Sequence, residues 1–269
     1  MPVIICSEQC KAGQNIKEWL IRKHGFAKAE HEKFKAWEKG ELLMIEAPEK
    51  LVEVDYLDEY FAADFYIFAS KHKSESGKPS FTVHTCGNWG PEAKVGGRQR
   101  ELAYSAPIPK KVAFQHLAKT PLEGFELTME CTHHGPTNMK TPLMFIEIGS
   151  TEKEWVNERA GEIIADAIMK ITGPELQKFR IAIGAGGTHY CPSFSKLELE
   201  TDLAFAHIIP NYAVDLLEEE TFVQAVEKSG TKLLVLDWKG LKGSQREKIT
   251  GFAKNSGLEI TSDKELRKS

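Results

Sequence analysis

Three loops of this sequence concentrate the side chains that could carry out catalysis or bind a metal ion. They occupy residues 84–90, 130–136 and 184–192, and each follows a short apolar run and is rich in histidine, cysteine, glycine and small polar residues. Because ligands of α/β sheets bind outside the carboxyl ends of the strands, we expect the three loops to meet at one crevice. Four of the nine histidines fall in these loops: His84, His133, His134 and His189.

Two kinds of chemistry suit this set of side chains. Neutral imidazoles could hold Zn²⁺, with Glu130 as a further ligand or as a residue that orients the histidines. Alternatively, one histidine could be a general base that activates water. The sequence contains no HExxH or similarly spaced pair, so it does not decide between a metal and a base. Our candidate catalytic and metal-binding residues are His84, Glu130, His133, His134 and His189.

Each of the three loops also contains a cysteine, namely Cys86, Cys131 or Cys191. These thiols could be nucleophiles or metal ligands, but we favour small, half-buried residues that fill space. The glycines at 184–187 follow a predicted strand, yet they lack the G-x-G-x-x-G spacing and no helix start follows them. A dinucleotide-binding fold is therefore not expected, and these glycines are expected to allow a close approach of backbone to a ligand or a neighbouring loop.

The window from Lys71 to Lys111 is basic in an otherwise acidic chain. It contains eight Lys or Arg residues and three acidic residues, so its net charge is +5 and that of the remaining chain is −9. Such a run is often only a solvated surface, but this one includes the first histidine loop, and Trp89 and Tyr104 could stack on bases. The pattern favours a phosphate backbone that is led toward a catalytic crevice.

The elements that must position these loops are predicted from hydrophobic periodicity. Apolar, β-rich runs predict nine strands, at residues 3–6, 42–45, 65–69, 81–83, 125–129, 143–148, 180–183, 204–209 and 233–236. The clearest amphipathic helix spans 156–171, and further helices are predicted at 16–24, 111–119, 218–228 and 244–255. Several strands are apolar throughout, as expected when helices cover both faces of a sheet. We predict a three-layer α/β/α fold: a single catalytic domain over residues 1–269, with a long basic loop insertion around 85–109.

Composition excludes several classes of protein. The chain has 269 residues, of which 41% are hydrophobic and 28% charged, so it can bury a substantial core and is not a disordered, collagen-like or coiled-coil protein. A net charge of −4 excludes a uniformly basic polyanion binder. Since no apolar run reaches the roughly 18–20 residues of a membrane span and the N-terminus lacks signal-peptide features, we expect no membrane contact and a cytoplasmic location. Five cysteines without a CxxC pair predict reduced thiols.

A series of short motifs runs in order through almost the whole chain. They lie at residues 69–77, 84–88 (HTxGN), 96–97 (GG), 130–136 (ExTHHGP), 186–192 (GGxHYxP), 207–210 (HIIP) and 237–240 (DxKG). In these motifs the chain resembles the archaeal and plant-type D-aminoacyl-tRNA deacylases. It departs from them at Lys71, where the family more often has arginine, and the family does not require its three loop cysteines.

The resemblance implies a mixed sheet of the phosphorylase/hydrolase-like type, a requirement for Zn²⁺, and hydrolysis of the ester that joins a D-amino acid to the terminal ribose of tRNA. D-aminoacyl-tRNA is then the partner, and we infer no obligate protein partner. From the motifs and the basic loop we predict seven substrate-binding residues: Ser70, His72, Asn88, Lys94, Arg98, Arg100 and Tyr190.

Two alternative functions also account for the histidines and the basic window. One is a zinc-dependent peptidase or amidohydrolase on the same fold, and the other is a non-catalytic module that binds zinc and RNA. Outside the loops, His207 lies within an apolar predicted strand, where we expect a core position or one that supports the site.

Overall fold

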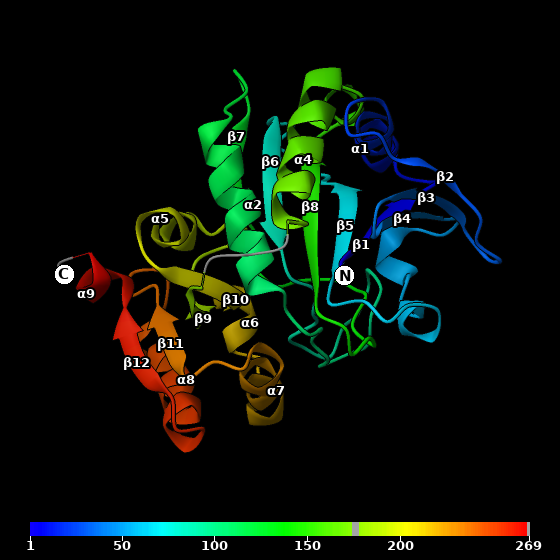
Figure 1. Ribbon diagram of the computed structural model, residues 1–269. Helices are drawn as coiled ribbons and strands as arrows, with labels where there is room; N and C mark the ends of the chain where they lie inside the picture. The colour runs from blue at the N-terminus through cyan, green and yellow to red at the C-terminus, as the bar shows by residue number, and fades with distance from the viewer. Residues whose placement is uncertain (174–177, 268–269) are drawn as a thin grey trace.

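The computed structural model describes residues 1–173 and 178–267, which form two sheets with flanking helices (Figure 1). The larger sheet has eight strands in the order β2-β3-β4-β1-β5-β8-β6-β7. Their bounds are β1 Val3–Ser7, β2 Ala27–Ala29, β3 Lys35–Lys39, β4 Leu42–Ala47, β5 Tyr66–Lys71, β6 Ser80–His84, β7 Glu126–Met129 and β8 Leu143–Gly149. Strand β8 runs parallel to β5 but antiparallel to β6, whereas β6 and β7 are parallel. The predicted α/β class with a mixed sheet is confirmed.

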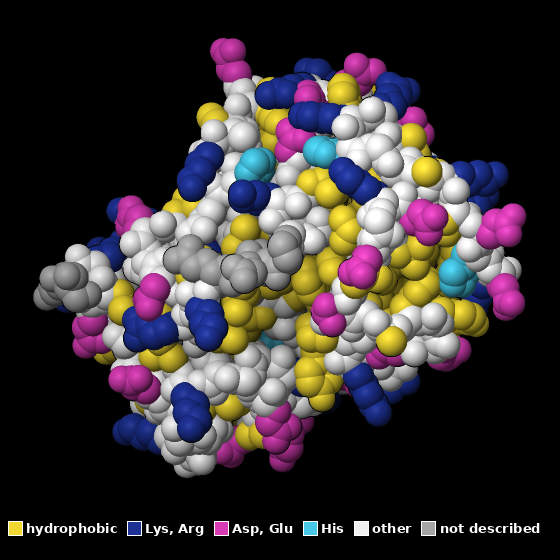
Figure 2. Space-filling model, in the orientation of Figure 1, with side chains coloured by type: hydrophobic (Ala, Val, Ile, Leu, Met, Phe, Trp, Pro, Cys, Tyr) yellow, Lys and Arg dark blue, Asp and Glu magenta, His cyan; other side chains and the backbone are white. Residues whose placement is uncertain are grey.

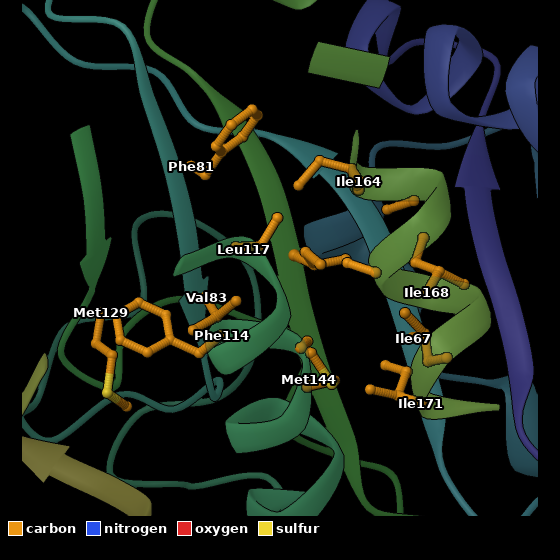
Figure 3. Packing of buried hydrophobic residues seen from close by; sticks show 14 of the residues in the cluster. Ile67, Phe81, Val83, Phe114, Leu117, Met129, Met144, Ile164, Ile168 and Ile171 are labelled. Atoms are coloured by element: carbon orange, nitrogen blue, oxygen red, sulfur yellow. The ribbon is translucent and has the colours of Figure 1, made fainter. Parts of the chain in front are cut away.

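Helices cover one face of this sheet (Figure 1). They are α1 Lys11–Arg22, α2 Pro107–Lys119 and α4 Glu158–Ile171, with the short α3 Glu152–Trp155 leading into α4. Figure 3 shows Ile164, Ile168 and Ile171 of α4 directed toward strands β5 and β8, as the predicted apolar stripe requires. Val156, which we placed in that stripe, is instead 54% exposed, because Asn157 caps the helix and α4 begins only at Glu158.

The opposite face of the larger sheet has a different cover. Alternation along β8 directs Leu143, Phe145 and Glu147 to this face. Here the cover consists of the two 3₁₀ turns η1 Leu51–Glu53 and η2 Leu57–Glu59 together with irregular loops. Helices therefore do not cover both faces of this sheet, and the loops leave room for a site on the exposed end of this face.

The smaller sheet is parallel throughout and has the order β10-β9-β11-β12. Its strands are β9 Arg180–Ala185, β10 Leu203–Ile209, β11 Leu233–Leu236 and β12 Glu259–Ser262. Helix α5 Pro192–Glu200 packs on one side, while α6 Asn211–Val214, α7 Glu219–Ser229 and α8 Gly243–Asn255 pack on the other; α9 Asp263–Leu266 follows β12. One hydrophobic cluster contains residues of both sheets.

All nine predicted strands and five predicted helices are present, although their ends shift. The short strands β2, β3 and β12 and the four-residue helices α3, α6 and α9 were not predicted from the sequence. Helix α5, whose weakly amphipathic sequence follows the third loop directly, was not predicted either. The basic insertion ends at residue 106, because α2 begins at Pro107. Among the described residues no helix has the length and apolar character of a membrane span. Acidic and basic side chains are interspersed on the face that carries α2 and α4 (Figure 2).

Candidate active site

The first two predicted loops meet because they follow parallel strands. His84 is the last residue of β6 and Glu130 comes directly after β7, so both lie at the same edge of the larger sheet. The loop that contains His133 and His134 folds back on the first loop, where the Gly87 amide donates to the His134 carbonyl at 2.8 Å. His134 has a φ of 44°, in the left-handed region that side chains with a Cβ seldom occupy, and such strain is concentrated at functional sites.

The third loop reaches the same place from the smaller sheet. His189 and Tyr190 follow β9, and the Cys131 amide donates to the His189 carbonyl at 2.9 Å. Residue 130 also pairs with residue 190 in an isolated antiparallel bridge. The predicted convergence of the three loops is thus observed, and it joins the two sheets at the site.

Two further site residues come from β8 and from the end of β5. Glu147 points to the same face as His84, and its Oε2 atom lies 3.4 Å from His84 Nε2. His72 follows β5, and its Nδ1 atom lies 3.0 Å from Glu130 Oε1 and 3.9 Å from Glu147 Oε2. Glu147 was not among the site residues predicted from the sequence; its signal was a single carboxylate within an otherwise apolar strand. His72 was expected only to bind substrate.

Glu130 is the centre of this cluster. Its Oε2 atom lies 2.8 Å from His189 Nε2 and 3.4 Å from His133 Nε2, while its other oxygen faces His72. Burial alone would raise the pKa of this carboxyl group, but its hydrogen bond with His189 and the adjacent imidazole of His72 outweigh burial and hold the pKa well below its usual value. Glu130 is therefore an ionised carboxylate that three imidazoles surround.

The imidazoles divide into two groups by their protonation. Burial lowers the pKa of His133 well below its usual value and that of His134 to about 4, so both rings are neutral at pH 7. Burial acts in the same direction on His72 and His189, but their hydrogen bonds with Glu130, and with Cys131 for His189, raise the pKa of each above its usual value. Neighbouring groups with oppositely shifted pKa values can serve as a base and an acid at the same pH.

The residues present fit a zinc ion. Ligand atoms of His84, His133 and His134 lie within 4.8 Å of one another. His133 Nδ1 and His134 Nδ1 donate to backbone carbonyls at 2.8 and 2.6 Å, which leaves both Nε2 atoms as acceptors. His84 Nε2 is buried and makes no hydrogen bond to a described residue. Three imidazoles supported by carboxylates form a set that Zn²⁺ prefers.

A cavity of about 550 Å³ opens onto these side chains. Among its lining residues are His72, His133, His134, Glu147 and His189, together with the predicted substrate-binding residues Ser70, Asn88 and Lys94. His84 and Glu130 lie behind this lining and are buried. Tyr190 is placed differently from our expectation: its hydroxyl hydrogen-bonds with His72 Nε2 at 2.7 Å, so it supports an imidazole of the cluster.

The basic loop is packed tightly against the histidine loop. Asn88 Nδ2 donates to the carbonyls of Gly96 and Arg98 at 3.0 and 3.1 Å, so Asn88 shapes the loop as well as lining the cavity. A Cβ at Gly135 would lie 2.2 Å from the Gly97 backbone nitrogen, so only glycine allows this approach.

Fewer basic side chains of the 71–111 window are accessible to a phosphate backbone than its net charge suggests. Lys110 and Lys111 are fully buried, and their ammonium groups donate to backbone carbonyls and to the Thr85 hydroxyl. Arg100 is paired with Glu218 at 2.7 Å. Arg98, with 62% of its side chain exposed, lies 3.9 Å from Glu101. Lys94 is paired with Glu92 at 2.7 Å, but 76% of its side chain is exposed, so both residues remain accessible.

The loop cysteines and His207 are buried. Burial raises the pKa of Cys86 and of Cys191 well above the usual value, which keeps both as thiols. The Sγ atom of the third cysteine, Cys131, lies 3.7 Å from His189 Nδ1 and 3.3 Å from the Tyr212 hydroxyl. His207 is fully buried with Nδ1 3.2 Å from the Thr132 hydroxyl, so it supports the second loop from the core.

Imidazoles and carboxylates gathered around a cavity at strand ends are the features of a hydrolytic enzyme. The family described as D-aminoacyl-tRNA deacylase matches residues 59–261. Proteins of that name are 38% identical in Pyrococcus furiosus, over 98% of this chain and 100% of the relative, and 35% identical in Archaeoglobus fulgidus, over 100% and 98%. A crystal structure of a conserved protein of unknown function is similar with a TM-score of 0.95 and 34% identity, over 100% of this chain and 97% of that chain. The chain belongs to the D-aminoacyl-tRNA deacylase family, as its motifs predicted.

Proposed function

We propose that this chain hydrolyses the ester bond between a D-amino acid and the terminal ribose of tRNA, releasing both. The observation that carries the proposal is the buried Glu130 carboxylate in contact with three imidazoles beside a cavity of about 550 Å³. D and L esters contain identical groups, so the discrimination between them must come from the shape of this cavity around the side chain of the amino acid.

His84, His133 and His134 would hold a zinc ion, with Glu147 behind His84. When bound, the ion would lower the pKa of water and polarise the ester carbonyl. We assign the proton transfer to Glu130 and His189, whose Oε2 and Nε2 atoms are 2.8 Å apart. Water attacks the carbonyl carbon, the carbon–oxygen bond to the ribose breaks, and this pair passes the proton of the water to the ribose oxygen.

The remaining groups orient this pair and the tRNA. His72 contacts Glu130 at 3.0 Å and is itself held by the Tyr190 hydroxyl, which fixes the carboxylate from the side opposite His189. Lys94 and Arg98 would contact tRNA phosphates, because both are exposed and lie in the loop beside the cavity. A tRNA substrate and five unpaired cysteines support our assignment of the reaction to the cytoplasm.

The test compares D-Tyr-tRNA with L-Tyr-tRNA. We expect release of tyrosine from the D ester alone, and a loss of kcat of about 10²- to 10⁴-fold in Glu130→Gln, as for removal of a general acid or base. The matched control is Glu126→Gln, an exposed glutamate at the start of β7. Cleavage of peptides in place of the ester would favour the peptidase alternative, and binding of tRNA without any release would favour the RNA-binding module.

A second experiment concerns the metal. Activity should be lost after dialysis against a strong chelator and return with Zn²⁺ alone. Full activity in a preparation that elemental analysis shows to be free of metal would remove zinc from the proposal and leave a neutral histidine as the general base.

A further inference from the structure

The smaller sheet has a ligand-binding position of its own that the proposed reaction does not use. From β9 the chain passes to β10 on one side, and it then returns to β11 on the other side of β9. In open parallel sheets such a reversal leaves a crevice outside the carboxyl ends of the two central strands, and ligands bind there. Here those ends carry the Gly186-Gly187 pair and the 237–240 motif.

A cavity of about 460 Å³ lies at this reversal. Its walls are the start of α6, the 239–242 segment and the first turn of α8. The loops that follow β9 and β11 pack closely against each other, because a Cβ at Gly240 would lie 2.5 Å from the Gly187 backbone nitrogen. Within the second of these loops, the Gly240 amide donates to Asp237 Oδ1 at 3.0 Å. The backbone at Gly240, which lines the cavity, is therefore held in place by these contacts.

Tyr212 separates this cavity from the catalytic cluster. The residue is 57% exposed and lines the cavity, while its hydroxyl lies 3.3 Å from Cys131 Sγ. That sulfur is 3.7 Å from His189 Nδ1. Two side chains, those of Tyr212 and Cys131, would thus lie between a molecule bound in this cavity and His189.

The side chains around the cavity match the parts of a nucleotide. Lys239 and Lys242 are exposed, and neither forms an ion pair with a residue that the structure describes, so both are available to a phosphate. The exposed Tyr212 ring can stack on a base of any identity.

We propose that this cavity binds the 3′-terminal adenosine of the tRNA, with the base on Tyr212 and the 5′-phosphate beside Lys239 and Lys242. The inference rests on the proposed function, because the ribose of that nucleotide carries the ester. Because the ribose joins the base to the phosphate, it then lies beside Tyr212, whose hydroxyl faces Cys131 and, beyond that sulfur, His189. The loop at 85–106 is then left to contact phosphates farther from the ester.

Adenosine 5′-monophosphate is the probe for this site. It should inhibit hydrolysis of D-Tyr-tRNA competitively and should bind the enzyme in calorimetry without tRNA. Tyr212→Ala should raise both KM and the dissociation constant of the probe between about fivefold and a hundredfold, as expected for the loss of one stacked base, with a smaller change in kcat. Tyr212→Phe keeps the ring and should restore binding relative to Tyr212→Ala.

The phosphate contacts are tested separately. A double variant, Lys239→Ala with Lys242→Ala, should weaken binding of adenosine monophosphate but not of adenosine. Two variants are controls. Tyr60→Ala removes a tyrosine that is 40% exposed and follows η2, and Lys254→Ala removes a lysine near the C-terminal end of α8. Neither control residue lines either cavity.

Two results separate this inference from the proposed function. If the wild type hydrolyses D-Tyr-tRNA but binding of the probe is unchanged in Tyr212→Ala and in the double lysine variant, the nucleotide binds elsewhere and the inference is overturned. If the wild type does not hydrolyse the ester but binds the probe with the expected sensitivity to these variants, the nucleotide site stands and the proposed function fails.

Discussion

Replacing Glu147 by glutamine tests whether the buried carboxylate on β8 supports the imidazoles of the proposed catalytic site. Its Oε2 atom lies 3.3 Å from the Thr82 hydroxyl, 3.4 Å from His84 Nε2 and 3.9 Å from His72 Nδ1. Glutamine keeps the size of the side chain and an acceptor for Thr82, but it removes the charge that faces two histidines. Loss of a group that orients a metal-binding histidine lowers metal affinity or activity about 10- to 100-fold. We expect that loss here, which is roughly 1.4–2.8 kcal/mol.

The same substitution should change stability much less. Burial alone would raise the pKa of Glu147, yet nearby His84 lowers it, while the charge of Glu130 opposes ionisation. Removing the charge therefore removes an attraction and a repulsion together. We expect the melting temperature to fall by no more than about 4 °C, equivalent to about 1 kcal/mol or a little more for a chain of this size.

Three measurements on Glu147→Gln check this reasoning. They are the single-turnover rate of D-tyrosine release, the zinc content from elemental analysis, and a thermal melt, each beside the exposed Glu126→Gln control. A single-turnover rate within twofold of the wild type at full zinc content would show that His84 does not need the carboxylate. A melting temperature lowered by 10 °C or more, about 3 kcal/mol, would show instead that Glu147 acts mainly on the fold.

Three further predictions concern other groups near the site. Cys86→Ser and Cys191→Ser should each retain most of the rate, because burial raises the pKa of both thiols and attack by water needs neither; a trapped thioester would contradict this. His207→Ala should lower unfolding free energy by about 2–4 kcal/mol at pH 8 through the cavity it leaves. Burial lowers the pKa of His207 to about 3, so between pH 6.5 and 3 the imidazole is protonated in the unfolded chain but not in the folded one. The free energy of unfolding of the wild type should therefore fall toward that of His207→Ala as the pH decreases through this range, as measured by denaturant titrations. Arg98→Ala should reduce the slope of log K against log salt for tRNA binding by about one. Arg100→Ala should change the slope less, because Glu218 already pairs with Arg100. Equal slopes for the wild type and Arg98→Ala would exclude a contact between Arg98 and a tRNA phosphate.

The sequence by itself predicted most of the longer elements and the three histidine loops. The strands and α4 follow from local periodicity, since a segment must direct its apolar side chains to one face whatever it packs against. The loops were recognised because histidine, glycine and small polar residues gather directly after apolar runs. Their convergence followed from a general property of α/β sheets, and the ordered motifs identified the family that the comparisons confirmed.

Only the tertiary structure decided which charged side chains belong to the site and which support the fold. Glu147 enters the cluster because β8 lies antiparallel to β6 and its alternation directs this residue to the face of His84. Lys110 is removed from any tRNA surface because α2 packs between the two sheets and its ammonium group bonds the Ala206 carbonyl. Pairing of strands and packing of helices depend on contacts between residues far apart in the chain, and a local pattern of charge contains no information about them.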